Sequence, residues 1–168
     1  GTIDVVDLAN LPVDLPFAQV DGRAGRAAYE YIERACVDAM HRSIHAIVTA
    51  PLNKEALHLG GLNYTGHTEI LGSLMGQTKY SMMLTSPKLR VIHVTTHIAL
   101  HDVPGRVKKD RIADVIALAQ ETLQLMGIER PRIAVAGLNP HCGEGGLFGD
   151  EDEREIVPAV REAQEKGW

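Results

Sequence analysis

Three histidines of this sequence stand where an imidazole could bind a metal ion or carry a proton. His97 ends "VTTH" and His141 lies in "LNPH", and each comes directly after an apolar run and beside Thr or Asn. His67 lies in "YTGHTE", where Gly66 permits a close backbone approach and Thr68 could cap a helix whose N-terminus would favour an anion. The plainer interpretation of "GHTE" is an ordinary capping turn, and the two interpretations are compatible.

The other five histidines carry weaker signals. His93 lies inside an apolar run, which predicts a buried and hydrogen-bonded residue. We interpret the remaining four as surface or capping residues, which is the ordinary environment of a histidine: His41, His45, His58 and His101.

The residues of this chain supply only part of a metal site. His97 and His141 would supply two imidazole nitrogens, whereas a catalytic zinc site usually has about three protein ligands and an open position. The third ligand is left open: it lies outside this chain, or it is one of His101, Asp102 and Glu144. Cys142 is a soft ligand by its chemistry, but adjacent residues seldom bind one ion together, which favours a buried bystander.

Lys54 and the glycine-rich segment 143–149 raise the question of phosphate binding. Lys54 could pair with a carboxylate or phosphate, act as a general acid if its pKa is depressed, or be a solvated lysine on a short helix. The segment "GEGGLFG" does not fit the GxGxxG fingerprint, and no GxxxxGK[ST] loop is present, so neither motif supports a nucleotide here. Its backbone N–H groups could still form an anion nest.

Strand-like and helix-like runs alternate along the chain, which predicts an α/β layered fold with a mostly parallel sheet. The expected strands are 45–51, 80–84, 89–97 and 132–137, with an antiparallel pair around residue 86. The expected helices are 24–42, 53–61, 68–76, 108–126 and 150–166. Because ligands of open α/β sheets bind beyond the carboxyl ends of the strands, we expect four polar loops to converge on one rim.

Two of these helices have an apolar stripe at helical spacing. In the helix expected over 24–42, the stripe consists of Ala28, Ile32, Ala35 and Ala39. In the helix expected over 108–126, it consists of Ile112, Val115, Ile116, Ala119 and Leu123. Gly127 follows where a glycine commonly ends a helix.

The bulk composition is that of an ordinary globular protein and excludes several classes. The 168 residues are 45% hydrophobic and 23% charged, enough for one sizeable core. A net charge of -5 gives no basic footprint for nucleic acid, and no apolar run approaches the length that spans a membrane. The two cysteines, Cys36 and Cys142, fit no disulfide framework, so the expected location is the cytoplasm.

Four motifs in one order resemble those of the 4-hydroxythreonine-4-phosphate dehydrogenase family (PdxA) of vitamin B6 biosynthesis and its close paralogues. They are "VTAPLNKEAL", "YTGHTEIL", "VTTHIAL" and "AGLNPHCGEGGLFG". The resemblance runs from the first expected helix to the last and corresponds to about the middle half of a family chain. It implies a three-layer α/β/α fold like that of isocitrate and isopropylmalate dehydrogenases, with residues 1–168 expected to form a single α/β domain.

The resemblance also implies an activity and its partners. Family members are NAD(P)-dependent dehydrogenases that need a divalent metal (Zn, Mg or Co) and act as homodimers with an active site shared between subunits. They oxidise a phosphorylated hydroxy acid such as 4-hydroxythreonine 4-phosphate, and the β-keto acid formed loses CO2. In this family the reaction serves pyridoxal phosphate biosynthesis, and neither nucleic acid nor a membrane is an expected partner.

Residue roles follow from the same match, position by position. His67 and Thr68 correspond to substrate contacts of the family, and His97 and His141 to metal ligands. Lys54 is our candidate catalytic residue, and no residue is assigned to cofactor binding. A third metal histidine and further substrate contacts fall in the C-terminal part of the family chain, so we expect the 168-residue chain alone to turn over no substrate.

Departures from the family pattern leave the substrate open. Cys142 stands where many members have alanine and Ala99 where proline is frequent, although neither removes a ligand. "LNKEALHLGG" resembles the paralogue branch more closely, whose members oxidise other four-carbon phosphorylated hydroxy acids (erythronate or threonate phosphate) or dihydrodiols. Two alternatives from other classes are a phosphate acyltransferase on a related fold, which would not need His97 and His141 for a metal, and a non-catalytic binding or dimerisation domain.

Overall fold

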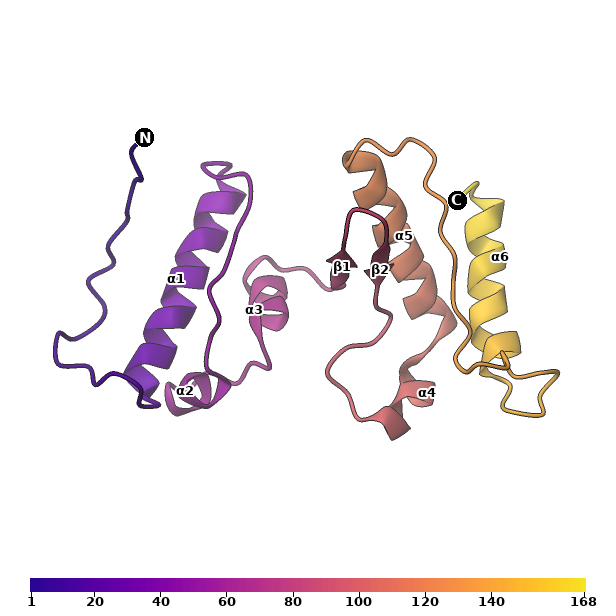
Figure 1. Ribbon diagram of the computed structural model, residues 1–168, viewed down its shortest axis with the longest axis horizontal. Coiled ribbons are helices and arrows are strands. Elements are labelled where there is room, and N and C mark those ends of the chain that lie inside the picture. Colours follow the sequence, from indigo (N-terminus) through magenta and orange to yellow (C-terminus); the bar gives the residue numbers. More distant parts are fainter. The chain divides into compact units, whose positions relative to one another are not determined.

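The computed structural model describes residues 1–168 and divides into two compact units, Gly1–Thr78 and Lys79–Trp168 (Figure 1). Helices α1 to α3 belong to the N-terminal unit, and the strands and the remaining helices belong to the C-terminal unit. The expectation of a single domain over residues 1–168 stays a prediction, and each unit is described by itself.

The N-terminal unit is built from three helices, α1 (Gly22–Met40), α2 (Lys54–Leu59) and α3 (His67–Leu74). All three were expected from the sequence. The Asp21 side chain caps α1, and the Asn53 side chain caps α2 by accepting the N–H of Ala56 at 2.9 Å. The capping position of α3 is Gly66, so the prediction that Thr68 caps this helix was wrong, and Thr68 lies inside its first turn.

The core of this unit lies where α1 packs against α2 and α3. Its buried residues are Ile32, Cys36, Leu57, Leu62 and Ile70. Of the stripe expected on α1, only Ile32 is buried, while Ala28 and Ala35 are half-buried and line an apolar pocket of about 320 Å³ beside segment 47–52. The buried face of α1 differs from the expected one because this helix approaches α2 through Gly25.

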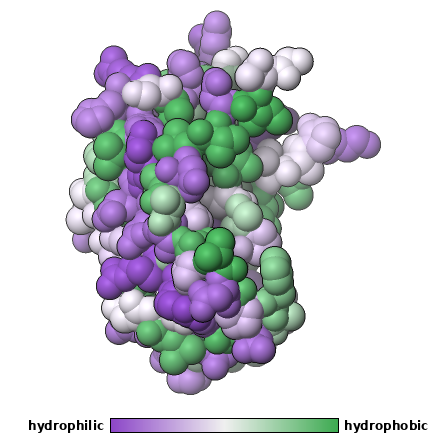
Figure 2. Space-filling view, turned by 90° about the vertical axis from the view of Figure 1, so that its left-hand side faces the viewer, coloured by the Kyte–Doolittle hydropathy of each residue, from purple (hydrophilic) through white to green (hydrophobic).

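The segment before α1 lies on the surface with much of its apolar area exposed. Val5, Val13 and Phe17 are largely exposed, and the face of the unit drawn in Figure 2 has hydrophobic side chains scattered among hydrophilic ones. Asn10 connects the segment to α1 by donating from Nδ2 to Glu30 Oε2 at 2.6 Å. Because the segment buries little apolar surface, the stability of this unit rests on its three helices.

The C-terminal unit begins with an antiparallel hairpin of β1 (Met83–Thr85) and β2 (Arg90–Ile92). This hairpin confirms the antiparallel pair expected around residue 86. The helical segments that follow are η1 (Leu100–Asp102), α4 (Val103–Arg106), α5 (Lys109–Leu125), η2 (Asp152–Ile156) and α6 (Val157–Glu165). None of the helices combines the length and the apolar character needed to cross a membrane.

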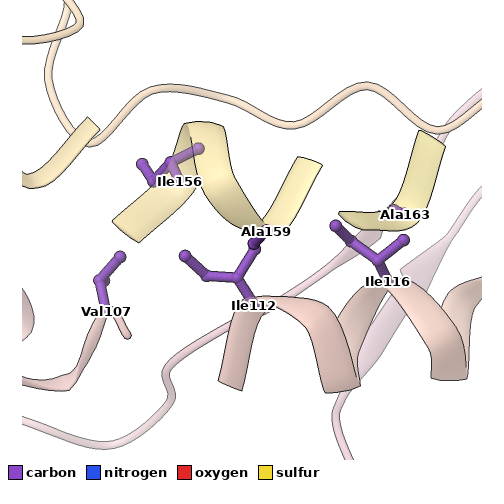
Figure 3. Packing of buried hydrophobic residues seen from close by; sticks show 6 residues of the cluster. All are labelled: Val107, Ile112, Ile116, Ile156, Ala159 and Ala163. Carbon is purple, nitrogen blue, oxygen red and sulfur yellow. The ribbon is translucent and has the colours of Figure 1, made fainter. Parts of the chain in front are cut away.

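Helices α5 and α6 pack together through the core of the C-terminal unit (Figure 3). Its buried residues are Val107, Ile112, Ile116, Ile156, Ala159 and Ala163. The stripe expected on α5 is confirmed at four positions, since Val115 and Ala119 are buried with Ile112 and Ile116, while Leu123 is half-buried. Gly127 has a φ of 86°, the left-handed conformation expected of a glycine that ends a helix.

The helix expected over 150–166 begins with a π-helical turn, η2, that was not anticipated. In this turn the N–H of Val157 bonds to the carbonyl of Asp152, five residues back. Pro158 follows directly, and a proline has no N–H to donate to the carbonyl four residues before it, here that of Arg154. The widened turn thus stands where regular α-helical bonding is already interrupted.

Two expected strands, 45–51 and 132–137, do not form as strands: these segments make no backbone hydrogen bonds to a neighbouring strand. In the second, Ile133 and Val135 pack against the core while Ala134 and Ala136 are exposed, which is the alternation of a strand. A strand needs a neighbouring strand to bond its N–H and C=O groups, and the only sheet in the structure is the β1–β2 hairpin. The prediction of a mostly parallel sheet was therefore wrong for this structure, and the three-layer arrangement stays a prediction.

Glu162 of α6 pairs with two lysines, Lys109 at the beginning of α5 and Lys166 at the end of α6 itself. Its carboxylate lies 2.9 Å from Nζ of Lys109 and 2.8 Å from Nζ of Lys166. Hydrogen bonds from Lys166 and Lys109 lower the pKa of Glu162 from an ordinary value of 4.5 to about 2. The stabilisation from the charged carboxylate is therefore complete above pH 4.5 and is lost as the pH falls through about 2.

We expect Glu162→Gln to flatten the loss of stability in acid. Thermal unfolding between about pH 6 and about pH 2 should show a smaller fall in Tm for the variant than for the wild type, and salt should reduce the difference because the contacts are partly exposed. Glu153→Gln, which changes an exposed carboxylate of η2, is the matched control and should behave as the wild type. Equal acid slopes for all three proteins would show that the Glu162 contacts contribute no stability.

Candidate metal and substrate site

The loop that carries His141 is held in shape by the side chain of Asn139. Its Oδ1 accepts the N–H of His141 at 2.9 Å, and its Nδ2 donates to the carbonyl of Phe148 at 3.0 Å. The amide therefore ties the two sides of the loop to each other. Asn139 thus acts on the backbone of the loop.

The imidazole of His141 is oriented by a carboxylate and an aromatic ring. Oε2 of Glu144 lies 3.1 Å from Nδ1, and the ring centroid of Phe148 lies 4.7 Å from that of the imidazole. A carboxylate at Nδ1 favours the tautomer with its proton on that nitrogen, which leaves the lone pair of Nε2 for a ligand. The side chain of His141 is 59% exposed, so a ligand can reach it.

The backbone of this loop adopts the left-handed conformation repeatedly. Glycines take it without steric cost, but Cys142 and Glu144 also have positive φ angles, of 49° and 44°. At Gly143 a Cβ would lie 2.6 Å from the carbonyl oxygen of Gly149, so the loop closes on its own backbone there. Strained residues of this kind concentrate at functional sites, where the surrounding contacts hold them in place.

His97 shares this backbone feature. It is exposed, has a φ of 56°, and follows the half-buried residues Thr95 and Thr96 beyond the end of β2. Histidine is among the residues that adopt this conformation more often than most. Nearby, His93 is half-buried with Nδ1 3.3 Å from the carbonyl oxygen of Met82, which confirms the predicted hydrogen bond but only part of the predicted burial.

Lys54, His67 and Thr68 belong to the N-terminal unit. Lys54 is exposed in the first turn of α2, and His67 and Thr68 are half-buried in the first turn of α3. His67 also lines the apolar pocket beside segment 47–52. The metal-ligand candidates lie in the other unit, so a common site for both sets of residues stays a prediction.

The donor set of this chain fits part of a metal site. No three His, Cys, Asp or Glu side chains lie together in a way that could hold an ion. Of the candidates for the third ligand, Asp102 Oδ1 lies 3.3 Å from His101 Nε2, and Glu144 contacts His141. Cys142 is exposed, so the prediction of a buried bystander was wrong, because the surrounding loop is a surface turn. The imidazoles of His97 and His141 suit a borderline divalent ion such as Zn²⁺ as two of its ligands.

Residues 1–168 match the family model described as pyridoxal phosphate biosynthetic protein PdxA. The chain belongs to the PdxA family. The resemblance carried by its four motifs is thereby confirmed. A D-threonate 4-phosphate dehydrogenase of Cupriavidus necator is 51% identical to this PdxA-family chain over 168 residues, which is 99% of the chain and 50% of the relative. The chain thus spans about half the length of the curated relatives it matches.

Solved structures agree with an α/β fold for this PdxA-family chain. A 4-hydroxythreonine-4-phosphate dehydrogenase from Burkholderia phymatum aligns with a TM-score of 0.84 and 54% identity, over 99% of this chain and 51% of that one. A terephthalate 1,2-cis-dihydrodiol dehydrogenase from Burkholderia xenovorans LB400 aligns with a TM-score of 0.70 and 30% identity, over 99% and 54% of the two chains. All three of these relatives are described as dehydrogenases.

Sequence reasoning did not single out Asp152, which lies buried beside the His141 loop of this PdxA-family chain. Its Oδ2 accepts the N–H of Leu138 at 3.2 Å. In the sequence, Asp152 lies within the acidic run "DEDERE", which is typical of a solvent-exposed first turn of a helix. Nothing local distinguishes the one buried carboxylate from its half-buried and exposed neighbours.

Proposed function

We propose that this PdxA-family chain forms part of a dehydrogenase that oxidises a four-carbon phosphorylated hydroxy acid, using NAD or NADP and a divalent metal. The observation that carries the proposal is the 51% identity, over 99% of the chain, to a D-threonate 4-phosphate dehydrogenase. D-Threonate 4-phosphate is therefore our first candidate substrate. This choice agrees with the resemblance of "LNKEALHLGG" to the paralogue branch and not to the vitamin B6 enzymes. A homodimer with a shared active site and a cytoplasmic location belong to the same proposal.

The residues of the chain have distinct roles in this proposal. His97 and His141 hold the divalent ion, His141 through Nε2, and a further ligand comes from outside the chain. When bound, the ion supplies positive charge that lowers the pKa of the substrate hydroxyl and stabilises the developing ketone. His67 and Thr68 contact the substrate, and the exposed Lys54 supplies a positive charge or a proton near it.

The chemistry suits a substrate with a hydroxyl group β to a carboxylate. The nicotinamide, when bound, supplies the acceptor for the hydride that leaves C3, while the hydroxyl proton passes to a base. The β-keto acid then breaks its C1–C2 bond, the bonding electrons move toward the ketone, and CO2 leaves. Protonation at C2 completes a three-carbon hydroxyketone phosphate.

A second candidate substrate is 4-hydroxythreonine 4-phosphate. It is favoured by the 54% identity to the Burkholderia phymatum protein, which is described as a dehydrogenase of that compound. The two substrates differ in carrying a hydroxyl or an amino group at C2, so oxidation and decarboxylation would give a hydroxyketone or an aminoketone phosphate. A dihydrodiol substrate has weaker support, because the terephthalate dihydrodiol dehydrogenase is 30% identical to this chain.

A dehydrogenase assay of the longer protein that contains this chain tests the proposal. The substrates are D-threonate 4-phosphate, D-erythronate 4-phosphate and 4-hydroxythreonine 4-phosphate, each with NAD or NADP and with Zn²⁺, Mg²⁺ or Co²⁺. We expect kcat/KM for D-threonate 4-phosphate to exceed the other values by at least about tenfold, because a site matched to one C2 substituent in one configuration leaves a polar group unpaired with a different substituent or with the opposite configuration. The 168-residue chain alone should reduce no nucleotide.

The products separate the outcomes of this assay. Formation of the hydroxyketone phosphate with release of CO2 supports the proposal, and a preference for 4-hydroxythreonine 4-phosphate selects the second candidate. The absence of nucleotide reduction with every substrate and metal would overturn the dehydrogenase proposal as a whole.

A further inference from the structure

Asp152 is the only buried charged side chain of the structure, with 6% of its surface exposed. Removing a carboxylate from water is costly unless hydrogen bonds replace the lost hydration. Here Oδ2 accepts the N–H of Leu138 at 3.2 Å. Leu138 directly precedes Asn139, the residue that ties the two sides of the His141 loop together.

Two glycines bring the loop into contact with Asp152. At Gly137 a Cβ would lie 2.9 Å from Oδ1 of Asp152 and 2.5 Å from Sγ of Cys142, so both groups approach the backbone where a side chain is missing. At Gly143 a Cβ would lie 3.9 Å from the Cβ of Asp152. Asp152 therefore bonds to the beginning of the loop and lies close to the loop backbone beyond His141.

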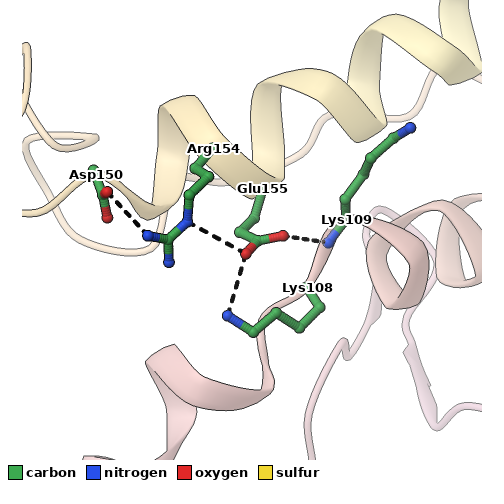
Figure 4. Close-up of polar contacts among 5 residues, drawn as sticks. All are labelled: Lys108, Lys109, Asp150, Arg154 and Glu155. Atoms are coloured by element: carbon green, nitrogen blue, oxygen red, sulfur yellow. Dashed lines mark hydrogen bonds and ion pairs between the residues drawn. The ribbon is translucent and has the colours of Figure 1, made fainter.

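The turn that carries Asp152 is fixed to the rest of the C-terminal unit at its other end. Glu155 accepts the N–H of Lys109 at 2.9 Å and lies 3.2 Å from Nζ of Lys108, at the beginning of α5 (Figure 4). Arg154 joins this cluster through Asp150 and Glu155. Ile156, the last residue of η2, is buried in the core shared by α5 and α6 (Figure 3). Asp152 thus projects from an element held by both ion pairs and core packing.

We propose that Asp152 is a positioning residue for His141. Its buried carboxylate fastens the first residues of the loop to η2, and through η2 to α5, so that the imidazole of His141 keeps one direction. Asn139 and Glu144 then fix the backbone and the ring within the loop. The inference rests on the proposed function, since it concerns the metal-binding role of His141, and it assigns to Asp152 no contact with the metal or the substrate.

Binding of Co²⁺ to the longer protein tests this role. Asp152→Ala removes the acceptor of the Leu138 N–H, and we expect it to weaken Co²⁺ binding about 10–100-fold, the range found when a group that orients a ligand is removed. The visible absorption of bound Co²⁺ should also change, because a displaced imidazole alters the ligand geometry. Asp152→Asn keeps an oxygen acceptor in the same place and should restore most of the affinity and the wild-type spectrum.

Two further variants keep the test decisive. Glu153→Ala removes an exposed carboxylate from the same turn and should leave the affinity and the spectrum unchanged. If Asp152→Ala does not fold, Asp152→Ser decides, because its hydroxyl keeps the buried position polar but is too short to reach the Leu138 N–H. We expect Asp152→Ser to weaken Co²⁺ binding and to alter the spectrum in the same direction.

The outcomes separate the positioning role from the proposed function. Wild-type affinity and spectrum in Asp152→Ala or Asp152→Ser, beside normal binding by the wild type, would overturn the positioning role alone. Weaker binding with an unchanged spectrum and no rescue by Asp152→Asn would also overturn it, because only general stability would then be affected. Failure of the wild type itself to bind Co²⁺ would overturn the proposed metal-dependent function, and this inference with it.

Discussion

Replacing His141 by alanine is expected to lower the affinity of the longer protein for Zn²⁺ or Co²⁺ by more than about 100-fold, and His97→Ala is expected to do the same. Loss of a group that merely orients a metal ligand lowers metal affinity about 10–100-fold. These two variants lose the metal ligand itself, so the effect should be larger. Both side chains are exposed, so their removal should have little effect on folding. Isothermal titration calorimetry, or the metal content after dialysis, measures the effect.

Two control variants sharpen this prediction. His45→Ala changes an exposed histidine that belongs to no motif of the site and should bind metal as the wild type does. Glu144→Gln should weaken binding by a smaller factor than His141→Ala, because the side-chain oxygen still accepts the Nδ1 proton but carries no charge. Unchanged metal content in both histidine variants would remove these residues from the metal site and would favour an acyltransferase-like or non-catalytic function.

The second large effect is expected at Gly25, where α1 meets α2. An added Cβ at this position would lie 2.0 Å from the carbonyl oxygen and 2.2 Å from the carbonyl carbon of Ala56. These are backbone atoms, so the two helices would have to separate. Alanine is the better helix former by about 1 kcal/mol, but overpacking of a tight contact commonly costs about 1–3 kcal/mol and can cost more. We expect Gly25→Ala to lower the free energy of unfolding by at least about 2 kcal/mol.

Urea unfolding followed by circular dichroism measures the effect of Gly25→Ala. The matched control is Gly105→Ala, which also places alanine in a helix, but at a position with no atom within 4 Å of the added Cβ. This control should be neutral or slightly stabilising, because only the helix propensity changes. If Gly25→Ala unfolds at the same urea concentration as the wild type, the close approach of α1 and α2 is not required for stability.

Several features of the protein could be predicted from short stretches of sequence, because their causes are local. The stripe of Ile112, Val115 and Ile116 recurs at the helical period, so α5 and its buried face followed directly. The hairpin around residue 86 also followed from two apolar runs and a short turn. His97 and His141 were recognised because their motifs are contiguous, and motif order along the chain was enough to indicate the family.

Other features depended on residues far apart in the sequence, and only the tertiary structure decided them. Segments 45–51 and 132–137 have the composition of strands, but a strand forms only where a second strand lies beside it. The buried face of α1 is set by the approach of Ala56 to Gly25, which no period within α1 encodes. Among the acidic residues at 150–155, only Asp152 is buried, and its Oδ2 accepts the N–H of Leu138, fourteen residues earlier in the chain. Burial and pairing are properties of two surfaces in contact, and one stretch of sequence specifies only one of them.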